Sequence, residues 1–328
     1  MSVASSSISV IIAAFADERW PSTLAAIASA RSQSMPPLEV IVCIDHNPHL
    51  LECARGFASE MPDVTVVDNT NARGVSGARN CGAAHAHGSV LVFLDDDAEA
   101  APDWLAMLQR GYTDSEVLGV GGRIEPMWVA NRPDWFPEEF LWVVGCSYRG
   151  LPSQPAPTRN LIGANMSFRR DVFEAVGGFR EDIGRVGSYP PVGCEDTALC
   201  IRACELWPGG KFLYEPRARV RHRVPDDRGK WEYFLRRCYA EGSSKAHLAH
   251  LFGLTTSLAL ERTFVSRTVP TGLLRATADT VLRGQIAGVA RGTAMLLGLL
   301  SAGAGFAVTM ATHRPRAATP LTTTLATR

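Results

Sequence analysis

The chain has 328 residues, of which 46% are hydrophobic and 20% charged, and its formal net charge is zero. This composition excludes an intrinsically disordered protein and allows one large domain with an appendage. The zero total hides an asymmetry: residues 1–210 contain 15 Lys or Arg and 26 Asp or Glu, whereas residues 211–328 contain 18 and 7. The basic part is also rich in Leu, Ala and Gly, which favours an anionic membrane surface over nucleic acid as its partner.

The first part of the chain alternates strand and helix patterns. Segment 10–15 is too short and lacks the basic flank of a signal peptide, so it is predicted as part of a first strand. No G-x-G-x-x-G motif follows it, and a dehydrogenase-type dinucleotide site is not expected. The alternation predicts an α/β fold with a parallel, doubly wound sheet. Strands are predicted at 8–14, 38–44, 64–67 and 90–94, and helices at 21–32, 49–59, 75–87 and 104–111.

Three adjacent carboxylates, Asp95, Asp96 and Asp97, follow the apolar run 89–94. Such a run predicts a buried parallel strand, and in open α/β sheets ligands bind at the carboxyl ends of the strands. Adjacent carboxylates repel one another unless a cation neutralises them, and hard oxygen ligands suit Mg²⁺ or Mn²⁺ bound to a diphosphate. The alternative is a solvated turn in which Asp97 caps the next helix.

Residues 121–157 are rich in Pro, Gly and Trp, including Trp128, Trp135 and Trp142. They predict either a structured insertion that packs its aromatic rings or a surface on which sugars stack. Regular patterns then resume. They predict an ordered segment at 160–169, a helix at 171–176 closed by Gly177 and Gly178, a helix after 194–197, and a strand near 211–214 leading into 220–224.

The C-terminal region has a basic helical pattern at 231–250 and no charged residue at 292–312. Twenty-one uncharged residues are enough to span about 30 Å of hydrocarbon, but the Gly, Ala, Ser and Thr content makes insertion marginal. A spanning helix, an amphipathic helix or hairpin at the membrane interface, and a helical cap on the preceding domain all remain open. We expect a first domain at 1–245, a helical region at 246–316 that is associated with a membrane in the first two cases, and a disordered tail at 317–328.

Eight short motifs occur in a characteristic order. They are VIIAAFADE (10–18), IVCIDHN (41–47), NARGVSGARN (71–80), FLDDD (93–97), GANMSFR (163–169), GGF (177–179), CEDT (194–197) and RH (221–222). Together they resemble the family 2 glycosyltransferases of the GT-A fold over roughly residues 8–245. The resemblance implies a Rossmann-like, mostly parallel sheet flanked by helices. It also implies an inverting, metal-dependent enzyme that transfers a sugar from a nucleotide sugar, UDP-linked, to a glycan or lipid-linked acceptor.

The resemblance also implies roles for individual residues. Asp95 and Asp97 match the D-x-D pair that holds Mg²⁺ or Mn²⁺, with His222 as a third ligand, and Asp196 matches the general base beside Glu195. The reaction needs charge neutralisation at the diphosphate and a carboxylate that takes the proton of the acceptor hydroxyl, so two separate acidic groups are required. Contacts with the nucleotide sugar are implied for Ala14, Phe15, Glu18, Asp45, Gly74, Arg79, Asp95, Asp96, Gly163 and Asn165, with Asp45 at the uracil ring.

Simpler interpretations of five of these residues remain open. Asp45 and Arg79 are also suited to capping helices, His222 to a solvated edge strand, and Glu195 with Asp196 to a helix N-terminus that the macrodipole favours. For the whole protein, the alternatives are a nucleotidyltransferase and a catalytically silent sugar-binding or scaffold protein. The first should carry a Gly-rich basic loop after the first strand, which this chain lacks, and the second need not keep mutually repelling acids.

Two further segments resemble a narrower group. VRHRVP (220–225) and RRCYAEGSSK (236–245) are similar to prokaryotic enzymes of cell-envelope or lipid-linked glycan synthesis, some of them glucuronosyltransferases. The eight cysteines contain no C-x-x-C pair and no zinc-site spacing, which indicates a reducing compartment. We therefore expect a cytoplasmic enzyme at the inner face of the cell membrane.

Overall fold

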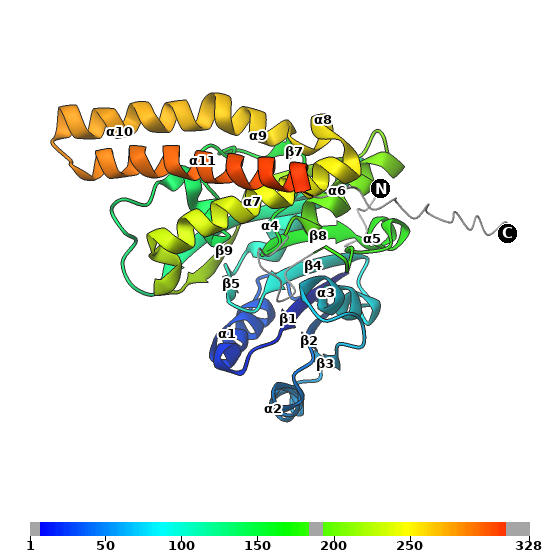
Figure 1. Ribbon diagram of the computed structural model, residues 1–328. Helices are drawn as coiled ribbons and strands as arrows, with labels where there is room; N and C mark the ends of the chain where they lie inside the picture. Colours follow the sequence, from blue (N-terminus) through cyan, green and yellow to red (C-terminus); the bar gives the residue numbers. More distant parts are fainter. Residues whose placement is uncertain (1–6, 184–192, 313–328) are drawn as a thin grey trace.

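The computed structural model describes residues 7–183 and 193–312, so the predicted tail at 317–328 lies outside the described residues. The described chain forms one nine-stranded sheet flanked by helices, with three long helices along one side (Figure 1). Its strand order is β3-β2-β1-β4-β8-β6-β9-β5, and β7 pairs with β9 outside that path. The strands are β1 (Ile8–Ala14), β2 (Glu39–Ile44), β3 (Val64–Asp68), β4 (Val90–Asp95), β5 (Ala98–Ala100), β6 (Val117–Trp128), β7 (Ala156–Thr158), β8 (Asn165–Arg169) and β9 (Lys211–Val224).

The half of the sheet formed by β1 to β4 is parallel, as predicted. β1 pairs with β2 and β4, and β2 pairs with β3. Val10, Val42 and Val92 are completely buried at the centres of their strands, since helices cover both faces. The connecting and flanking helices are α1 (Trp20–Arg31), α2 (Pro48–Ala58), α3 (Val75–Ala84), α4 (Trp104–Gly111), α5 (Arg170–Val176) and α6 (Glu195–Leu206).

The other half of the sheet is mixed, within the α/β fold with flanking helices that the sequence predicts. β8 is antiparallel to β4 and β6, β6 is parallel to β9, and β5 and β7 are antiparallel to β9. The sequence did not predict β6 because Gly119, Gly121, Gly122 and Pro126 interrupt its pattern. The glycines serve close packing: a Cβ at Gly122 would lie 1.9 Å from the carbonyl oxygen of Ala218 in β9.

The tryptophan-rich segment packs two of its three tryptophans, partly buried, against other aromatic rings. Trp135 stacks on Trp231 with ring centroids 4.0 Å apart, and Trp128 contacts Phe136 edge-on at 5.5 Å. These two tryptophans confirm the interpretation of a structured insertion. Trp142, in the short helix η2 (Glu138–Val144), instead lines the cavity described below.

The C-terminal region begins with α7 (Trp231–Phe252), which runs without interruption through the expected domain boundary at residue 245. The helical pattern ends only at Gly253, whose φ is +79°. The remaining elements are α8 (Leu254–Ser257), α9 (Ala259–Thr263), the π-helical turn η4 (Phe264–Thr268), α10 (Val269–Arg283) and α11 (Ala287–Thr312).

One face of α11 packs closely on α7. A Cβ at Gly242 would lie 1.8 Å from the carbonyl oxygen of Ala302, and a Cβ at Gly305 would lie 2.1 Å from that of Tyr239. Glycine at these positions therefore lets the two helix backbones approach each other. This contact agrees with the helical-cap interpretation for the inner face of α11.

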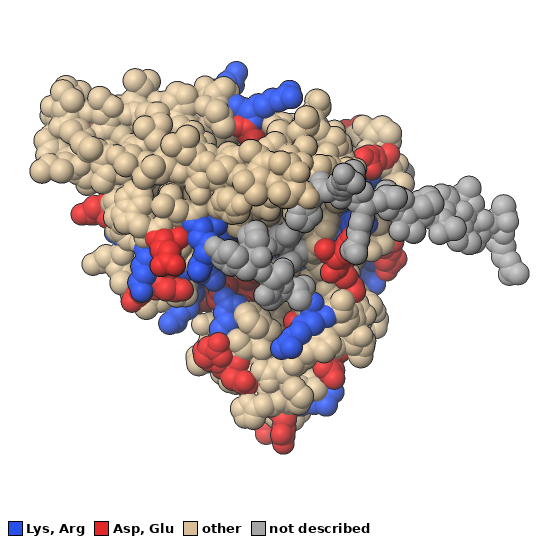
Figure 2. All heavy atoms as spheres, in the orientation of Figure 1, with Lys and Arg blue, Asp and Glu red and all other residues tan. Residues whose placement is uncertain are grey.

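The outer face of the antiparallel pair α10 and α11 is apolar and exposed. Side chains on it include Val281, Leu282, Ile286 and Leu300, which are 73, 80, 84 and 69% exposed. Figure 2 shows an almost uncharged surface over this pair, with charged side chains gathered mainly on the part of the molecule that contains the sheet. Within the described chain, α11 is the one helix long and apolar enough to cross a membrane, and 28% of its most apolar stretch is buried.

Candidate active site

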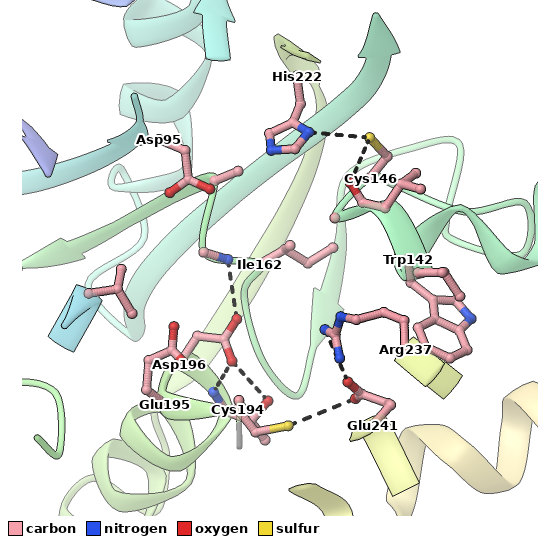
Figure 3. Close-up of a pocket in the computed structure, with 18 of the residues that line it drawn as sticks. Asp95, Trp142, Cys146, Ile162, Cys194, Glu195, Asp196, His222, Arg237 and Glu241 are labelled. Atoms are coloured by element: carbon pink, nitrogen blue, oxygen red, sulfur yellow. Dashed lines mark hydrogen bonds and ion pairs between the residues drawn. The ribbon is translucent and has the colours of Figure 1, made fainter. Parts of the chain in front are cut away.

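A cavity of about 1270 Å³ opens at the carboxyl ends of β1, β2 and β4. This is the edge at which a parallel sheet presents ligand-binding loops. Figure 3 shows Asp95 and His222 on one side of it and Glu195 and Asp196 on another. The sequence-predicted residues that line it are Ala14, Phe15, Glu18, Asp45, Gly74, Arg79, Asp95, Asp96, Asp97, Gly163, Glu195, Asp196 and His222.

Asp95, Asp97 and His222 form a cluster with the character of a metal site. One ligand atom from each lies within 4.8 Å of the others. The pairing of β5 with β9 places His222 opposite Ala98, directly after the acidic turn, and Nε2 of His222 is 3.1 Å from Oδ1 of Asp97. His222 is only 5% exposed, so it is not a solvated edge residue.

Arg19 is a site residue that the sequence interpretation missed. Its guanidinium donates to Oδ1 of Asp96 at 2.8 Å and to Oδ2 of Asp97, and it lies 5.3 Å from the centre of the Phe15 ring. Both carboxylates are buried, which contradicts the solvated-turn alternative. Arg19 is the first basic residue after β1 and directly follows Asp17 and Glu18, and this position was the available signal.

The pKa values of Asp96 and Asp97, which are adjacent in the acidic turn, are shifted in opposite directions. Burial raises the pKa of Asp96 to about 8, and the neighbouring carboxylates of Asp97 and Asp95 add to the effect of burial. Burial also acts to raise the pKa of Asp97, but the hydrogen bond with His222 and the charge of Arg19 lower it to about 2. Oδ2 of Asp96 is buried without a hydrogen-bond partner in the described chain.

These residues fit a divalent cation. Two carboxylates and an imidazole within reach of one ion form a donor set that both Mg²⁺ and Mn²⁺ accept. A buried oxygen without a partner and a surplus of acidic groups are further features that added positive charge would stabilise.

Glu195 and Asp196 begin α6, at the opposite side of the cavity. Cys194 before them has a left-handed backbone with φ of +75°, which is unusual for a residue other than glycine and occurs where a site requires it. Asp196 accepts hydrogen bonds from the amides of Thr197 at 2.6 Å and Gly163 at 3.2 Å. Burial, with a contribution from Glu195, raises the pKa of Asp196 to about 6. A carboxylate with this pKa is ionised at neutral pH and is a stronger base than an exposed aspartate.

Arg79 joins the two acidic groups. It donates to Oδ1 of Asp95 at 2.8 Å, to Oε1 of Glu195 at 3.1 Å and to the carbonyl oxygen of Gly163 at 3.2 Å. Its side chain thus spans from the metal-type cluster to the start of α6 instead of capping its own helix.

Asp45 holds the loop before α3, where β2 ends at the cavity. Its carboxylate accepts hydrogen bonds from the side-chain amide of Asn69 at 2.7 Å and the backbone amide of Gly74 at 2.9 Å. The next helix, α2, is capped by Asn47, whose side chain accepts from the amide of Leu50. The helix-cap interpretation of Asp45 is therefore wrong.

Asn165 is the predicted site residue that lies outside this lining. It is completely buried, accepts a hydrogen bond from Nε1 of Trp104 at 2.8 Å, and donates to the carbonyl oxygens of Ala218 at 2.9 Å and Arg123 at 3.1 Å. These bonds tie β8 to its neighbours, so the geometry favours a structural role.

A second group of missed residues lies on α7. Tyr233, Arg237, Glu241 and Lys245 are spaced four residues apart and all line the cavity, a spacing that would have revealed a common helix face. Nζ of Lys245 is 3.2 Å from Glu241 and 2.9 Å from Glu261.

Comparison with known proteins agrees with this geometry. The profile described as Glycosyl transferase family 2 matches residues 9–177. A protein of Haloferax volcanii named glucosyl-dolichyl phosphate glucuronosyltransferase is 35% identical over 239 residues, which cover 73% of this chain and 76% of that protein. Succinoglycan biosynthesis protein ExoM of Rhizobium meliloti is 27% identical over 231 residues, covering 69% of this chain and 70% of ExoM.

Two solved structures share the fold. Mannosyltransferase PcManGT from Pyrobaculum calidifontis, in complex with GDP-Man and Mn²⁺, aligns with a TM-score of 0.59 at 20% identity, covering 93% of this chain and 88% of that one. GalNAc-T7 with UDP, GalNAc and Mn²⁺ aligns with a TM-score of 0.54 at 18% identity, covering 80% of this chain and 54% of that one.

Proposed function

The chain belongs to glycosyltransferase family 2 and has the GT-A fold, as its motifs predict, and from that premise we propose that it transfers glucuronic acid from UDP-glucuronic acid to a lipid-linked sugar with inversion. The observation that carries the proposal is the presence of two separate acidic groups in one cavity, bridged by Arg79. The Haloferax relative, whose name states glucuronosyl transfer to glucosyl-dolichyl phosphate, supports the choice of sugar and acceptor.

The first acidic group serves the leaving diphosphate. Asp95, Asp97 and His222 would hold a divalent cation, whose charge stabilises the departing diphosphate when bound. Asp45 and the loop that begins α3 at Gly74 lie at the end of the cavity assigned to the uracil ring.

The second acidic group serves the acceptor. Asp196 takes the proton of the attacking hydroxyl, and the amides of Gly163 and Thr197 fix the orientation of its carboxylate. A single base opposite the leaving group suffices for direct displacement, which inverts the anomeric carbon. Arg79 holds Glu195 in place beside the base.

The exposed apolar face of α10 and α11 supports action at a membrane surface. We place this face in the interfacial layer of the cytoplasmic leaflet, with the catalytic part in the cytoplasm. Arg262 and Arg267, which are exposed and form no ion pair in the described chain, would add attraction to anionic lipids of about 1 kcal/mol each. Arg275, Arg283 and Arg291 contribute less because they are paired with Glu139 or Asp279.

The test is a donor screen with the full-length protein and Mn²⁺, which follows nucleotide release from UDP-glucuronic acid, UDP-glucose, UDP-N-acetylglucosamine and GDP-mannose. The proposal expects the fastest release from UDP-glucuronic acid and its loss on chelation with EDTA. Preference for another donor would refute the sugar assignment. Release that EDTA leaves unchanged would refute the metal assignment.

A further inference from the structure

The cavity changes character along its length. Beyond the acidic groups, η2, α9, η4 and α11 line it with aromatic and aliphatic side chains, namely Phe140, Trp142, Leu260, Phe264, Leu299 and Phe306. These rings adjoin one another: the ring centroid of Phe264 lies 5.4 Å from that of Phe140 and 6.3 Å from that of Trp142. The chemistry assigned above uses none of them, so this apolar part is available to another portion of the substrate.

Arg237 lies beside the apolar part. Figure 3 shows it on the Trp142 side of the cavity, opposite Asp196. Its one ion pair within the described chain is a long contact of 3.6 Å with Glu241, and its side chain is 15% exposed. Lys245, two turns further along α7, is neutralised by two glutamates at shorter distances. Arg237 therefore keeps donors available for an anionic ligand.

The apolar lining continues to the outer surface of the protein. Leu299 lines the cavity, whereas Leu296 and Leu300, on the same stretch of α11, are 50 and 69% exposed. Val265 also lines the cavity and is 51% exposed. An apolar chain can thus lie between the cavity and the exposed face of α10 and α11 while remaining in contact with apolar side chains.

We propose that this apolar part binds the first isoprenoid units of the lipid-linked acceptor, with Arg237 contacting the phosphate. The assignment rests on the proposed function. An acceptor of this class has a sugar, an anionic phosphate and a branched hydrocarbon chain in sequence. The cavity presents Asp196 to the sugar, the guanidinium of Arg237 to the phosphate and the apolar side chains to the hydrocarbon chain.

The test measures binding of farnesyl phosphate to the full-length protein by calorimetry, without donor. Arg237→Gln should weaken binding at least about tenfold through loss of a charge-assisted contact. Its matched control is Arg236→Gln, the exposed neighbour on the same helix, which should leave binding unchanged. Phe264→Glu should also weaken binding, whereas Leu38→Glu, at a position that is 54% exposed and outside the cavity lining, should not.

Binding of farnesol measures the contribution of the isoprenoid chain alone, and binding of inorganic phosphate measures that of the anionic group alone. Binding of UDP with Mn²⁺ reports on the donor site. The proposal expects farnesyl phosphate to bind more tightly than either fragment, with UDP binding intact in all four variants. It is overturned if UDP binds but farnesyl phosphate does not, or if neither Arg237→Gln nor Phe264→Glu weakens it. Failure of the wild-type protein to bind UDP would instead refute the proposed function.

Discussion

The backbone amide of Gly163 donates a hydrogen bond to Oδ2 of Asp196 at 3.2 Å. The carbonyl oxygen of the same glycine accepts from Arg79, which is also bound to Asp95. Position 163 has little room for a side chain, because a Cβ there would lie 3.0 Å from the guanidinium of Arg79. The loop before β8 thus connects Asp196, the proposed base, to the cluster of Asp95, Asp97 and His222 through one residue.

The raised pKa of Asp196 predicts how activity depends on pH. Since burial raises this pKa to about 6, the base is protonated below that pH and ionised above it. The value of kcat/KM should therefore rise about tenfold from pH 5 to pH 7, as expected for one titrating group. Asp196→Asn should lower transfer roughly 10²–10⁴-fold and remove this rise. A wild-type profile that is flat over this range would contradict the assignment.

The same pKa has a consequence for stability. The folded protein holds a proton on Asp196 between its ordinary pKa of 3.8 and about 6, whereas the unfolded chain releases it. The contribution of Asp196 to the free energy of unfolding should therefore fall as pH rises through this window. The quantity to measure is the denaturant midpoint of Asp196→Asn minus that of wild type. This difference should be larger at pH 7 than at pH 4.

Removal of the Arg19 charge should strengthen cation binding. Arg19 pairs with Asp96 and Asp97, so Arg19→Gln leaves two buried carboxylates without their cationic partner. We expect Mn²⁺ to bind Arg19→Gln several-fold more tightly by calorimetry in the absence of nucleotide. Arg73→Gln is the control, since Arg73 lines the cavity, is exposed and has no ion pair in the described chain. Equal affinities in wild type and Arg19→Gln would contradict this role.

The close approach of α7 and α11 predicts opposite effects of one substitution at two neighbouring glycines. Gly305→Ala places a Cβ 2.1 Å from a backbone oxygen and should cost about 1–3 kcal/mol of unfolding free energy. Gly303→Ala meets nothing within 4 Å and should raise stability by up to about 1 kcal/mol through helix propensity. Denaturant unfolding measures both, and a neutral Gly305→Ala would show that the two helices do not pack as described.

A substitution at Asn165 can distinguish a structural role of this residue from a contact with the donor. Asn165→Leu removes three hydrogen bonds of a completely buried side chain and should cost about 2–4 kcal/mol. Because Asn165 does not line the cavity, KM for the donor should stay unchanged in the folded enzyme. A several-fold rise in KM at full folding would restore the donor-binding role that the family resemblance implies.

Local pattern predicted the parallel half of the sheet, since uninterrupted apolar runs alternate there with helices. It failed at β6, where glycines needed for close strand packing remove the usual strand signal. The ordered motifs predicted which acidic residues line the cavity together, because Asp95 ends β4 and Glu195 with Asp196 begins α6. Arg19 and Arg237 were missed: their positions in the sequence place them near the site, but the partners of their side chains depend on tertiary contacts that no local pattern specifies.

The most direct test of the account compares Asp97→Asn with Asp196→Asn by calorimetric titration with UDP-glucuronic acid in the presence of Mn²⁺. In the proposed function, the first acidic group binds the donor and the second takes the proton of the acceptor. We therefore expect Asp97→Asn to lose Mn²⁺-dependent donor binding and Asp196→Asn to bind the donor as wild type does. Unchanged binding by Asp97→Asn, or loss of binding by Asp196→Asn in a folded protein, would contradict this division of roles.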